Sequence, residues 1–208
     1  MQRAVTRAKV QEYTSINIQS LYVDGLNAGK LALLEDYCIE ERPDILALQG
    51  TKFTVEALPP NLQIEGYYHH VKERSEKDKK GGGLIMYYKT EIPIRTWKRP
   101  GKNVALATVN ETPWIMLETK TSKMAIANVY MACQSSKNKN FMDWNMKIYN
   151  ELKADVEVLR DLNFAIFMVG DFNGWTGKQR GMEGNNPVVN ENGRMLLDFI
   201  DEEEFYAQ

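Results

Sequence analysis

The sequence predicts an α/β protein in which two β-sheets pack face to face and helices cover their outer faces. Three observations lead to this prediction. Strand, helix and strand patterns follow one another within residues 12–49, short β-rich runs fill the middle of the chain, and a long helical stripe followed by an apolar strand returns near residue 170. Loops at the strand ends would then form one edge at which polar residues converge.

The first 50 residues predict one βαβ-like unit after a polar, basic lead-in. Residues 12–20, EYTSINIQS, alternate and are rich in β-formers, which predicts a strand that ends near Asn17. Residues 27–43 predict a helix that carries Leu31, Leu34 and Cys38 on one face and stops at Pro43. Residues 44–49, DILALQ, are nearly all apolar, as expected for a short strand covered on both sides.

The middle of the chain predicts an antiparallel meander. Its β-rich runs lie at residues 81–89, 92–97, 104–109, 114–120 and 124–131, separated by turn residues. Residues 140–162 then predict a helix with an apolar stripe at three- and four-residue steps: Phe141, Trp144, Ile148, Leu152, Val156 and Leu159. A buried strand is predicted at 164–170, and a helix at 192–205.

Composition narrows the class of protein. The chain has 208 residues and 43% apolar content, which fits a single core, so residues 1–208 are expected to form one domain. The net charge of -2 neither favours nor excludes a nucleic-acid partner. Cys38 and Cys133 lie in apolar contexts and are expected to be buried reduced thiols, with a disulfide as the alternative. Without a candidate membrane span or a signal-peptide core, the protein is expected to be soluble and intracellular.

Polar side chains stand where three apolar runs stop. Asn17 follows one run, Tyr130 follows another, and Asp171 and Asn173 follow the strand at 164–170. Asp171 and Asn173 point the same way if the segment is extended, and Gly170 allows another group to approach the backbone. Each residue alone also fits a simple role, Asn and Asp as turn or cap residues and Tyr130 as a wall residue.

Six stretches together resemble a known family. They are SINIQSL, DILALQGTK, GGGLIMYYK, ANVYM, MVGDFNGW and NENGRMLLDF, in this order between residues 13 and 205. The set resembles the exonuclease–endonuclease–phosphatase superfamily, and most of all the endonuclease domains of non-LTR retrotransposons. The resemblance implies a four-layer α/β sandwich, cleavage of phosphoester bonds with Mg²⁺ or Mn²⁺, and DNA as the partner.

The resemblance also implies a role for each polar residue. Asn17 would help hold the metal region, and Tyr130 would contact the scissile phosphate. Asp171 would position or deprotonate the attacking water, and Asn173 would orient the phosphate or the metal shell. These roles suit the reaction, because a hard cation neutralises the charge that develops on phosphate oxygens while a carboxylate activates water.

The chain departs from the family pattern at two places. Relatives carry a glutamate, their principal metal ligand, at the position of Gly50, and glycine offers no side chain. Glu56 lies beyond the strand end and is not expected to replace it. Relatives also continue past the last helix through further strands to a Ser-Asp-His motif. The sequence given does not reach such a motif, so the sandwich is expected to lack its last strands, and His69 and His70 are not expected to be catalytic.

The leading hypothesis is therefore a DNA-nicking endonuclease domain of a retroelement, impaired in this chain and nuclear if the host is a eukaryote. Lys52 is a further predicted DNA contact, and Lys77, Lys79 and Lys80 lie in a charged loop that could touch phosphates or simply face solvent. Trp175 fits either the core or a base-stacking role. Two alternatives stay open: a phosphatase or sphingomyelinase of the same fold, and a non-catalytic nucleic-acid-binding module.

Overall fold

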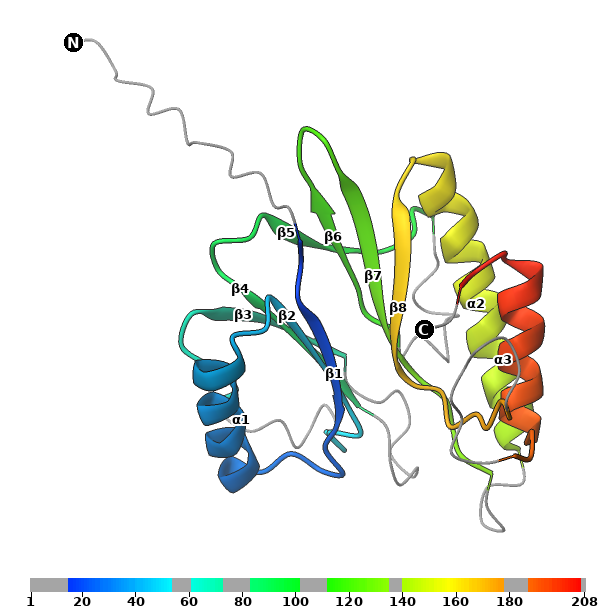
Figure 1. The fold of residues 1–208 in the computed structure, drawn as a ribbon, viewed down its shortest axis with the longest axis horizontal. Coiled ribbons are helices and arrows are strands. Elements are labelled where there is room, and N and C mark those ends of the chain that lie inside the picture. Colours follow the sequence, from blue (N-terminus) through cyan, green and yellow to red (C-terminus); the bar gives the residue numbers. More distant parts are fainter. Residues whose placement is uncertain are drawn as a thin grey trace.

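The computed structural model describes residues 15–53, 61–72, 83–101, 112–134, 140–177 and 187–206. Within them, strands form two four-stranded sheets flanked by helices (Figure 1). The first sheet, in the order β1-β2-β4-β3, contains β1 (Ile18–Tyr22), β2 (Ile45–Gln49), β3 (Tyr67–Lys72) and β4 (Leu84–Lys89). The second, in the order β5-β6-β7-β8, contains β5 (Ile94–Trp97), β6 (Trp114–Glu118), β7 (Lys123–Tyr130) and β8 (Ala165–Asp171). The helices are α1 (Ala28–Glu41), α2 (Phe141–Asp161) and α3 (Glu191–Glu202).

Each sheet has one parallel pair of strands. β1 runs parallel to β2 with Tyr22 beside Gln49, and β7 runs parallel to β8 with Tyr130 beside Asp171. The other pairs are antiparallel. β1 and β8 lie close together across the interface between the sheets, so the two parallel pairs share one side of the molecule (Figure 1).

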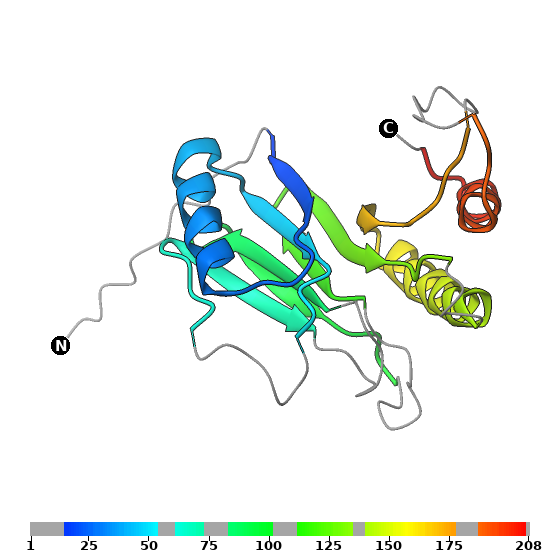
Figure 2. The ribbon, with the colours of Figure 1, turned by 90° about the horizontal axis from the view of Figure 1, so that it is seen from below.

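Two helical layers and two sheets form four layers, with hydrophobic side chains packed between them. α1 covers the outer face of the first sheet, and α2, with α3 beside it, covers the outer face of the second (Figure 2). Between the sheets lie the buried side chains of Ile45, Met86, Ile115 and Ile126. The predicted stripe of residues 140–162 is confirmed, because its members on α2 pack against the second sheet. The predicted four-layer α/β sandwich is therefore confirmed.

Local signals explain where the helices begin and end. Asn27 caps α1, since its side chain accepts a hydrogen bond from the Lys30 backbone N–H at 3.0 Å. Arg42 then adopts a left-handed conformation before Pro43. Asn190 caps α3 in the same way, accepting from Gly193 N at 2.7 Å.

The first predicted strand lies further along the chain than expected. It was predicted to end near Asn17, but β1 begins at Ile18 and ends at Tyr22. Asn17 precedes the strand, where its backbone N–H donates to Asp44 Oδ2 at 2.8 Å. The strand continues because its ladder with β2 continues as far as Gln49, and it stops just before the turn signal Asp24-Gly25. Asn17 therefore lies before the start of the strand, whereas it was expected at the strand's carboxyl end.

Three further expectations meet different outcomes. Cys38 is buried, and burial raises its pKa to about 11, but Cys133 is exposed and the prediction of a buried thiol there is wrong. His69 and His70 lie within β3 and are partly buried. The β-rich run at 104–109, Glu56 and the lysines at 77, 79 and 80 lie outside the described residues.

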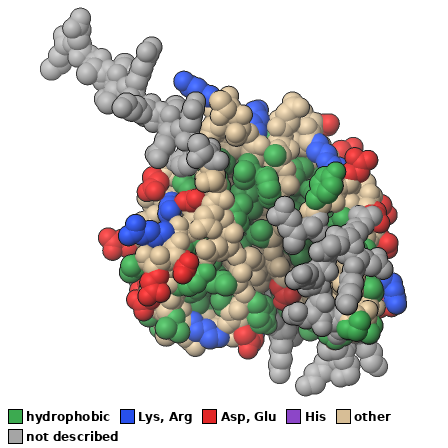
Figure 3. Space-filling model, viewed as in Figure 1, with side chains coloured by type: hydrophobic (Ala, Val, Ile, Leu, Met, Phe, Trp, Pro, Cys, Tyr) green, Lys and Arg blue, Asp and Glu red, His purple; other side chains and the backbone are tan. Residues whose placement is uncertain are grey.

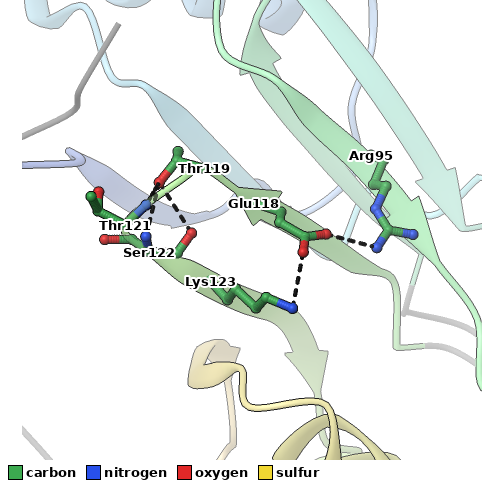
Figure 4. A network of polar contacts seen from close by, with 6 residues as sticks. All are labelled: Arg95, Glu118, Thr119, Thr121, Ser122 and Lys123. Atoms are coloured by element: carbon green, nitrogen blue, oxygen red, sulfur yellow. Dashed lines mark hydrogen bonds and ion pairs between the residues drawn. The ribbon is translucent and has the colours of Figure 1, made fainter. Parts of the chain in front are cut away.

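The β6–β7 turn closes the end of the second sheet that lies opposite the carboxyl ends of β7 and β8. Thr119 and Ser122 hold the turn, with Thr119 N donating to Ser122 O at 2.8 Å. The Glu118 carboxylate forms ion pairs with Lys123, whose Nζ lies 3.0 Å from Oε1, and with Arg95, whose Nη2 lies 3.4 Å from Oε2 (Figure 4). These ion pairs are partly exposed, so they contribute little to stability.

Two strands form sheet edges on the same side. Among the described strands, β1 and β8 each have a neighbour on one side only. Hydrophobic side chains gather over these strands in the view of Figure 3, and Phe167 of β8 is 43% exposed. Within the described part of the chain, the helices are too short or too polar to cross a membrane.

Candidate functional site

The carboxyl ends of β1, β2, β7 and β8 meet at one edge of the sandwich, the lower edge in Figure 1. We call this edge the mouth. Its first-sheet side is formed by Tyr22, Asp24, Gly50 and Lys52, and its second-sheet side by Tyr130, Asp171 and Asn173. The charge of Asp171 acts on the Tyr22 hydroxyl and contributes to raising its pKa, after burial and Asp24, so the two sides lie within electrostatic reach of each other.

The second-sheet side is an acid and an amide held in fixed geometry. Asp171 accepts hydrogen bonds from the backbone N–H of Asn173 and from Asn173 Nδ2, both at 3.0 Å. Asn173 Nδ2 also donates to Met131 O at 2.8 Å. Burial raises the pKa of Asp171, and the bonds from Asn173 oppose that rise. The carboxylate is thus oriented by its neighbour and remains an acceptor toward the mouth.

Buried asparagines of the helices support this side. Asn145 of α2 accepts from Ala132 N at 2.8 Å and donates to Ala132 O at 2.9 Å. Asn192 of α3 donates to the same carbonyl at 2.9 Å and accepts from Asn145 at 2.9 Å. Asn190 donates to Asn173 O at 3.1 Å. The loops after β7 and β8 are therefore tied to both helices.

On the first-sheet side, two loops are joined by their backbones. Val23 N donates to Gln49 O, Gly25 N to Gly50 O and Leu26 N to Thr51 O, at 2.9, 2.6 and 3.0 Å. The loop after β1 therefore runs along the loop after β2 and extends their pairing beyond the sheet. The backbone of Gly50 is held between these bonds.

Asp24 and Lys52 form an ion pair across these two loops. Lys52 Nζ lies 2.5 Å from Asp24 Oδ1, with both side chains largely exposed. The hydrogen bond from Lys52 lowers the pKa of Asp24, and the same bond raises the pKa of Lys52. The Asp24 carboxylate is thus already bound to a cation of the protein itself.

The ring of Tyr22 lies against Gly50. A Cβ atom built on Gly50 would come within 2.4 Å of Tyr22 Cε2 and 3.0 Å of Cδ2 and Cζ. The Tyr22 hydroxyl donates to Asp24 at 3.4 Å, a weak bond, and the residue is 51% exposed. The space that a side chain at residue 50 would need is occupied by this ring.

Unusual backbone conformations mark the same edge. In the described part of the chain, six residues other than glycine have positive φ. Arg42, Asn163 and Glu204 follow helix ends, where a left-handed residue is common. The other three, Asp24, Lys52 and Asn173, all lie at the mouth, with φ of 43°, 61° and 48°. Such conformations cost energy and cluster at functional sites.

A buried amide pair connects the sheets just inside the mouth. Gln49 Nε2 donates to Asn128 Oδ1 at 2.7 Å. Asn128 Nδ2 donates to Leu48 O at 3.0 Å and to Ile85 O at 3.1 Å. Asn128 is fully buried and Gln49 is 1% exposed. These bonds between β7 and the first sheet fix the two sides of the mouth relative to each other.

The structure brings together most of the predicted site residues. Tyr130, Asp171, Asn173 and Lys52 lie at the mouth, beside Gly50. Asn17 does not, because it lies at the opposite end of β1, bonded to Asp44, so its prediction as a metal-region residue is wrong in placement. Tyr22 was missed. The turn signal at Asp24-Gly25 could have placed Tyr22 at the end of the first strand. Its packing on Gly50 could not be read in the same way, because the two residues are 28 positions apart in the chain.

The residues present do not form the metal site that the resemblance implies. A divalent cation needs oxygen ligands, and Mg²⁺ is usually held by one or two carboxylates. At residue 50 there is no ligand and Tyr22 fills the space, while Asp24 is paired with Lys52. The described residues contain no cluster of three or more His, Cys, Asp or Glu that could hold a metal ion. Of the carboxylates at the mouth, Asp171 alone faces no cation of the protein in the contacts described above.

Comparisons with known proteins agree with this fold. The chain is 38% identical over 78 residues to the DNA repair nuclease APEX1 of Danio rerio, a match that covers 37% of the chain and 25% of that protein. It is similar to the AP endonuclease LMAP of Leishmania major, with a TM-score of 0.64 and 17% identity, over 90% of this chain and 66% of that one. It is also similar to the 3′ phosphatase NExo of Neisseria, solved with a product DNA hairpin, with a TM-score of 0.59, 16% identity and coverage of 90% and 71%.

A family model matches far more of the chain than the sequence relative does. Residues 14–200 match the model of the Endonuclease/Exonuclease/phosphatase family. This range includes all eight strands that the structure describes and nearly all of α3, and it contains both sides of the mouth. The chain therefore belongs to the Endonuclease/Exonuclease/phosphatase family.

Proposed function

We propose that this chain is a DNA-directed phosphodiesterase domain whose phosphate-facing half is intact and whose metal-binding half is impaired. One observation carries the proposal: Tyr130, Asp171 and Asn173 meet at the mouth, whereas residue 50 is a glycine covered by Tyr22. The relatives support DNA as the partner, since their names describe a DNA repair nuclease, AP endonucleases and a phosphatase bound to DNA.

The second-sheet residues suit attack on a phosphodiester. Asp171 keeps a carboxylate oriented by two hydrogen bonds, and its raised pKa makes it a stronger base toward water. Tyr130 stands beside it in the register of β7 and β8, where its hydroxyl can donate to a phosphate oxygen. Family members typically use a divalent metal, Mg²⁺ or Mn²⁺, to neutralise charge in this reaction. Without that charge, cleavage by this chain is expected to be slow.

The proposed kinship within the family is with retroelement endonucleases. It rests on the stretches MVGDFNGW and NENGRMLLDF, which resemble those domains. In the structure these stretches form the second-sheet side and its support, because Asn190 caps α3 and bonds Asn173 O. Nicking of DNA and a nuclear location in a eukaryotic host belong to this proposal.

Supercoiled plasmid tests the proposal. Wild type, Asp171→Ala and Asn173→Ala are incubated with Mg²⁺ or Mn²⁺, and duplex binding is measured in parallel by fluorescence anisotropy. Binding with slow nicking that disappears in Asp171→Ala is expected, because that carboxylate is the base. Nicking that persists in Asp171→Ala would refute the assignment, and failure to bind DNA would refute the partner.

Because the Tyr22 ring covers residue 50, a second, non-catalytic function also fits the mouth. A non-catalytic nucleic-acid-binding module would use the same mouth to hold a phosphate without hydrolysis. Lys52, now paired with Asp24, would provide positive charge for such binding once a phosphate replaces Asp24 as its partner. This alternative predicts binding by the wild type with no nicking above that of Asp171→Ala in either metal.

A further inference from the structure

We propose that Tyr22 and Gly50 form an interlocked pair in which the Tyr22 ring plugs the metal position of the mouth, so that a carboxylate at residue 50 must displace the ring before it can bind a divalent ion. This inference deepens the proposed function and rests on it for the location of the metal position. It concerns the cause of the impairment, which is then a filled space in addition to an absent ligand.

The contact between ring and glycine is too close to admit a side chain. The built Cβ lies 2.4 Å from Tyr22 Cε2, well inside ordinary van der Waals contact. The three ring atoms nearest to it are Cε2, Cδ2 and Cζ, so the flank of the ring, not a single atom, fills the space. A larger residue would place more atoms in the same volume.

The backbone around Gly50 cannot easily move to relieve this contact. Gly50 has a φ of 71°, a conformation that other residues adopt at a cost. Its carbonyl accepts the bond from Gly25 N at 2.6 Å, and Thr51 N donates to Gly83 O at 3.1 Å. Relief must therefore come from the ring, which is half-exposed and can rotate only by leaving its place on Gly50.

Neighbouring carboxylates do not bypass the plug. Asp24 is bound by Lys52 at 2.5 Å, and Asp171, oriented by Asn173, offers a single carboxylate on the opposite side. Restoring a ligand at residue 50 would place a second carboxylate across the mouth from Asp171, the arrangement that Mg²⁺ and Mn²⁺ prefer. With the ring in place, that carboxylate must first push the ring aside, which weakens binding.

The test measures Mn²⁺ binding, both by isothermal titration calorimetry and by electron paramagnetic resonance of the free ion. The variants are Gly50→Glu, Tyr22→Ala and Tyr22→Ala/Gly50→Glu. The matched control is Tyr22→Phe/Gly50→Glu, which keeps the ring and loses only the hydroxyl. We expect the alanine double variant to bind Mn²⁺ at least about tenfold more tightly than wild type, either single variant or the phenylalanine double variant. Adding Asp171→Asn should remove the gain, because both carboxylates are needed.

Three outcomes would overturn the inference. They are equal binding by the two double variants, a full gain in Gly50→Glu alone, or no gain in the folded alanine double variant. If that variant does not fold, urea denaturation provides the test. Gly50→Ala must then lower the urea midpoint less in the Tyr22→Ala background than in wild type, and an equal decrease in both backgrounds refutes the plug. Wild-type DNA binding, measured separately, tests the proposed function, so failure of one does not imply failure of the other.

Discussion

Two glycines, one on each side of the mouth, exclude side chains for different reasons. A Cβ on Gly170 in β8 would lie 2.0 Å from the carbonyl oxygen of Val129, its partner in β7. A Cβ on Gly50 would meet the ring of Tyr22 instead. The first obstacle is backbone inside a sheet, and the second is a half-exposed side chain. Gly170 is therefore a requirement of the fold, whereas Gly50 depends on one other residue and its exclusion of side chains is reversible.

The same difference extends to the support of each side. The second-sheet side is held by Asn145 and Asn192, which are buried and fully engaged with Ala132 and each other. On the first-sheet side the loops are joined by backbone bonds, but the side chains of Asp24 and Lys52 form a largely exposed pair, a type of contact that contributes little to stability. The half that would activate water is thus built into the core, and the half that would hold a metal lies at the surface.

Gly170→Ala should be the most damaging of the substitutions considered. The Val129 carbonyl cannot move away without breaking the pairing of β7 and β8, so we expect a loss of more than about 3 kcal/mol in the free energy of unfolding. Urea denaturation followed by circular dichroism measures it. A loss near 1 kcal/mol would show that the strand adjusts easily and would weaken the contrast with Gly50.

Asn128→Ala should follow in size. It removes the donors to Leu48 O and Ile85 O and one acceptor of Gln49 Nε2, which keeps its bonds to Ser20 Oγ and Ala47 O, and it empties a fully buried polar site, at a cost of about 2–4 kcal/mol. The exposed Asn150 of α2 is a matched control, and Asn150→Ala should change stability by less than about 0.5 kcal/mol. Similar losses for both variants would contradict the importance of the amide bridge.

Gly50→Ala should have a smaller effect, and Gly66→Ala separates its two causes. Gly66 has a φ of 79° with no atom within 4 Å of a built Cβ, so it reports the cost of the backbone conformation alone, about 1 kcal/mol. Gly50→Ala adds displacement of the Tyr22 ring and should cost about 1 kcal/mol more. Equal urea midpoints for the two variants would indicate that the ring yields freely.

Asp171→Asn should have the smallest effect on stability, and the size of this effect depends on pH. Because burial raises the pKa of Asp171, the native state keeps its proton at pH values where the unfolded chain has lost it. The wild type therefore loses stability as the pH rises from about 4 through the native pKa. The variant should equal wild type near pH 3 and exceed it at neutral pH, as measured by thermal unfolding at both pH values. A variant that is less stable at neutral pH would show that the bonds from Asn173 outweigh burial.

Much of the fold could be predicted from the sequence because its signals are local. The stripe on α2, the stop at Pro43 and the apolar strand at 45–49 each depend on residues close together in the chain. The ends of strands are harder, since a ladder with a distant strand decides them. The ladder with β2 extends β1 to Tyr22 and leaves Asn17 at the far end.

The candidate site could be predicted only where its residues follow a strong strand. Asp171 ends β8, Asn173 lies two residues further on, and Tyr130 ends β7, so the pattern located them. Tyr22 could not be assigned its role, because the residue on which it packs has no side chain and lies in another loop. The exposure of Cys133 likewise depends on the loop after β7, which is shaped by Asn145 and Asn192.

The hydrogen bonds from Asn128 of β7 to β2 and β4 affect how this domain tolerates substitutions. Because the amide bonds lie behind the mouth, they prevent the sheets from sliding over each other whatever residue stands at position 22 or 50. Alterations at the rim then remain local, and the acid on the far rim keeps its position. A lineage could lose and regain metal chemistry here through changes at two codons, those of residues 22 and 50, with the scaffold preserved throughout.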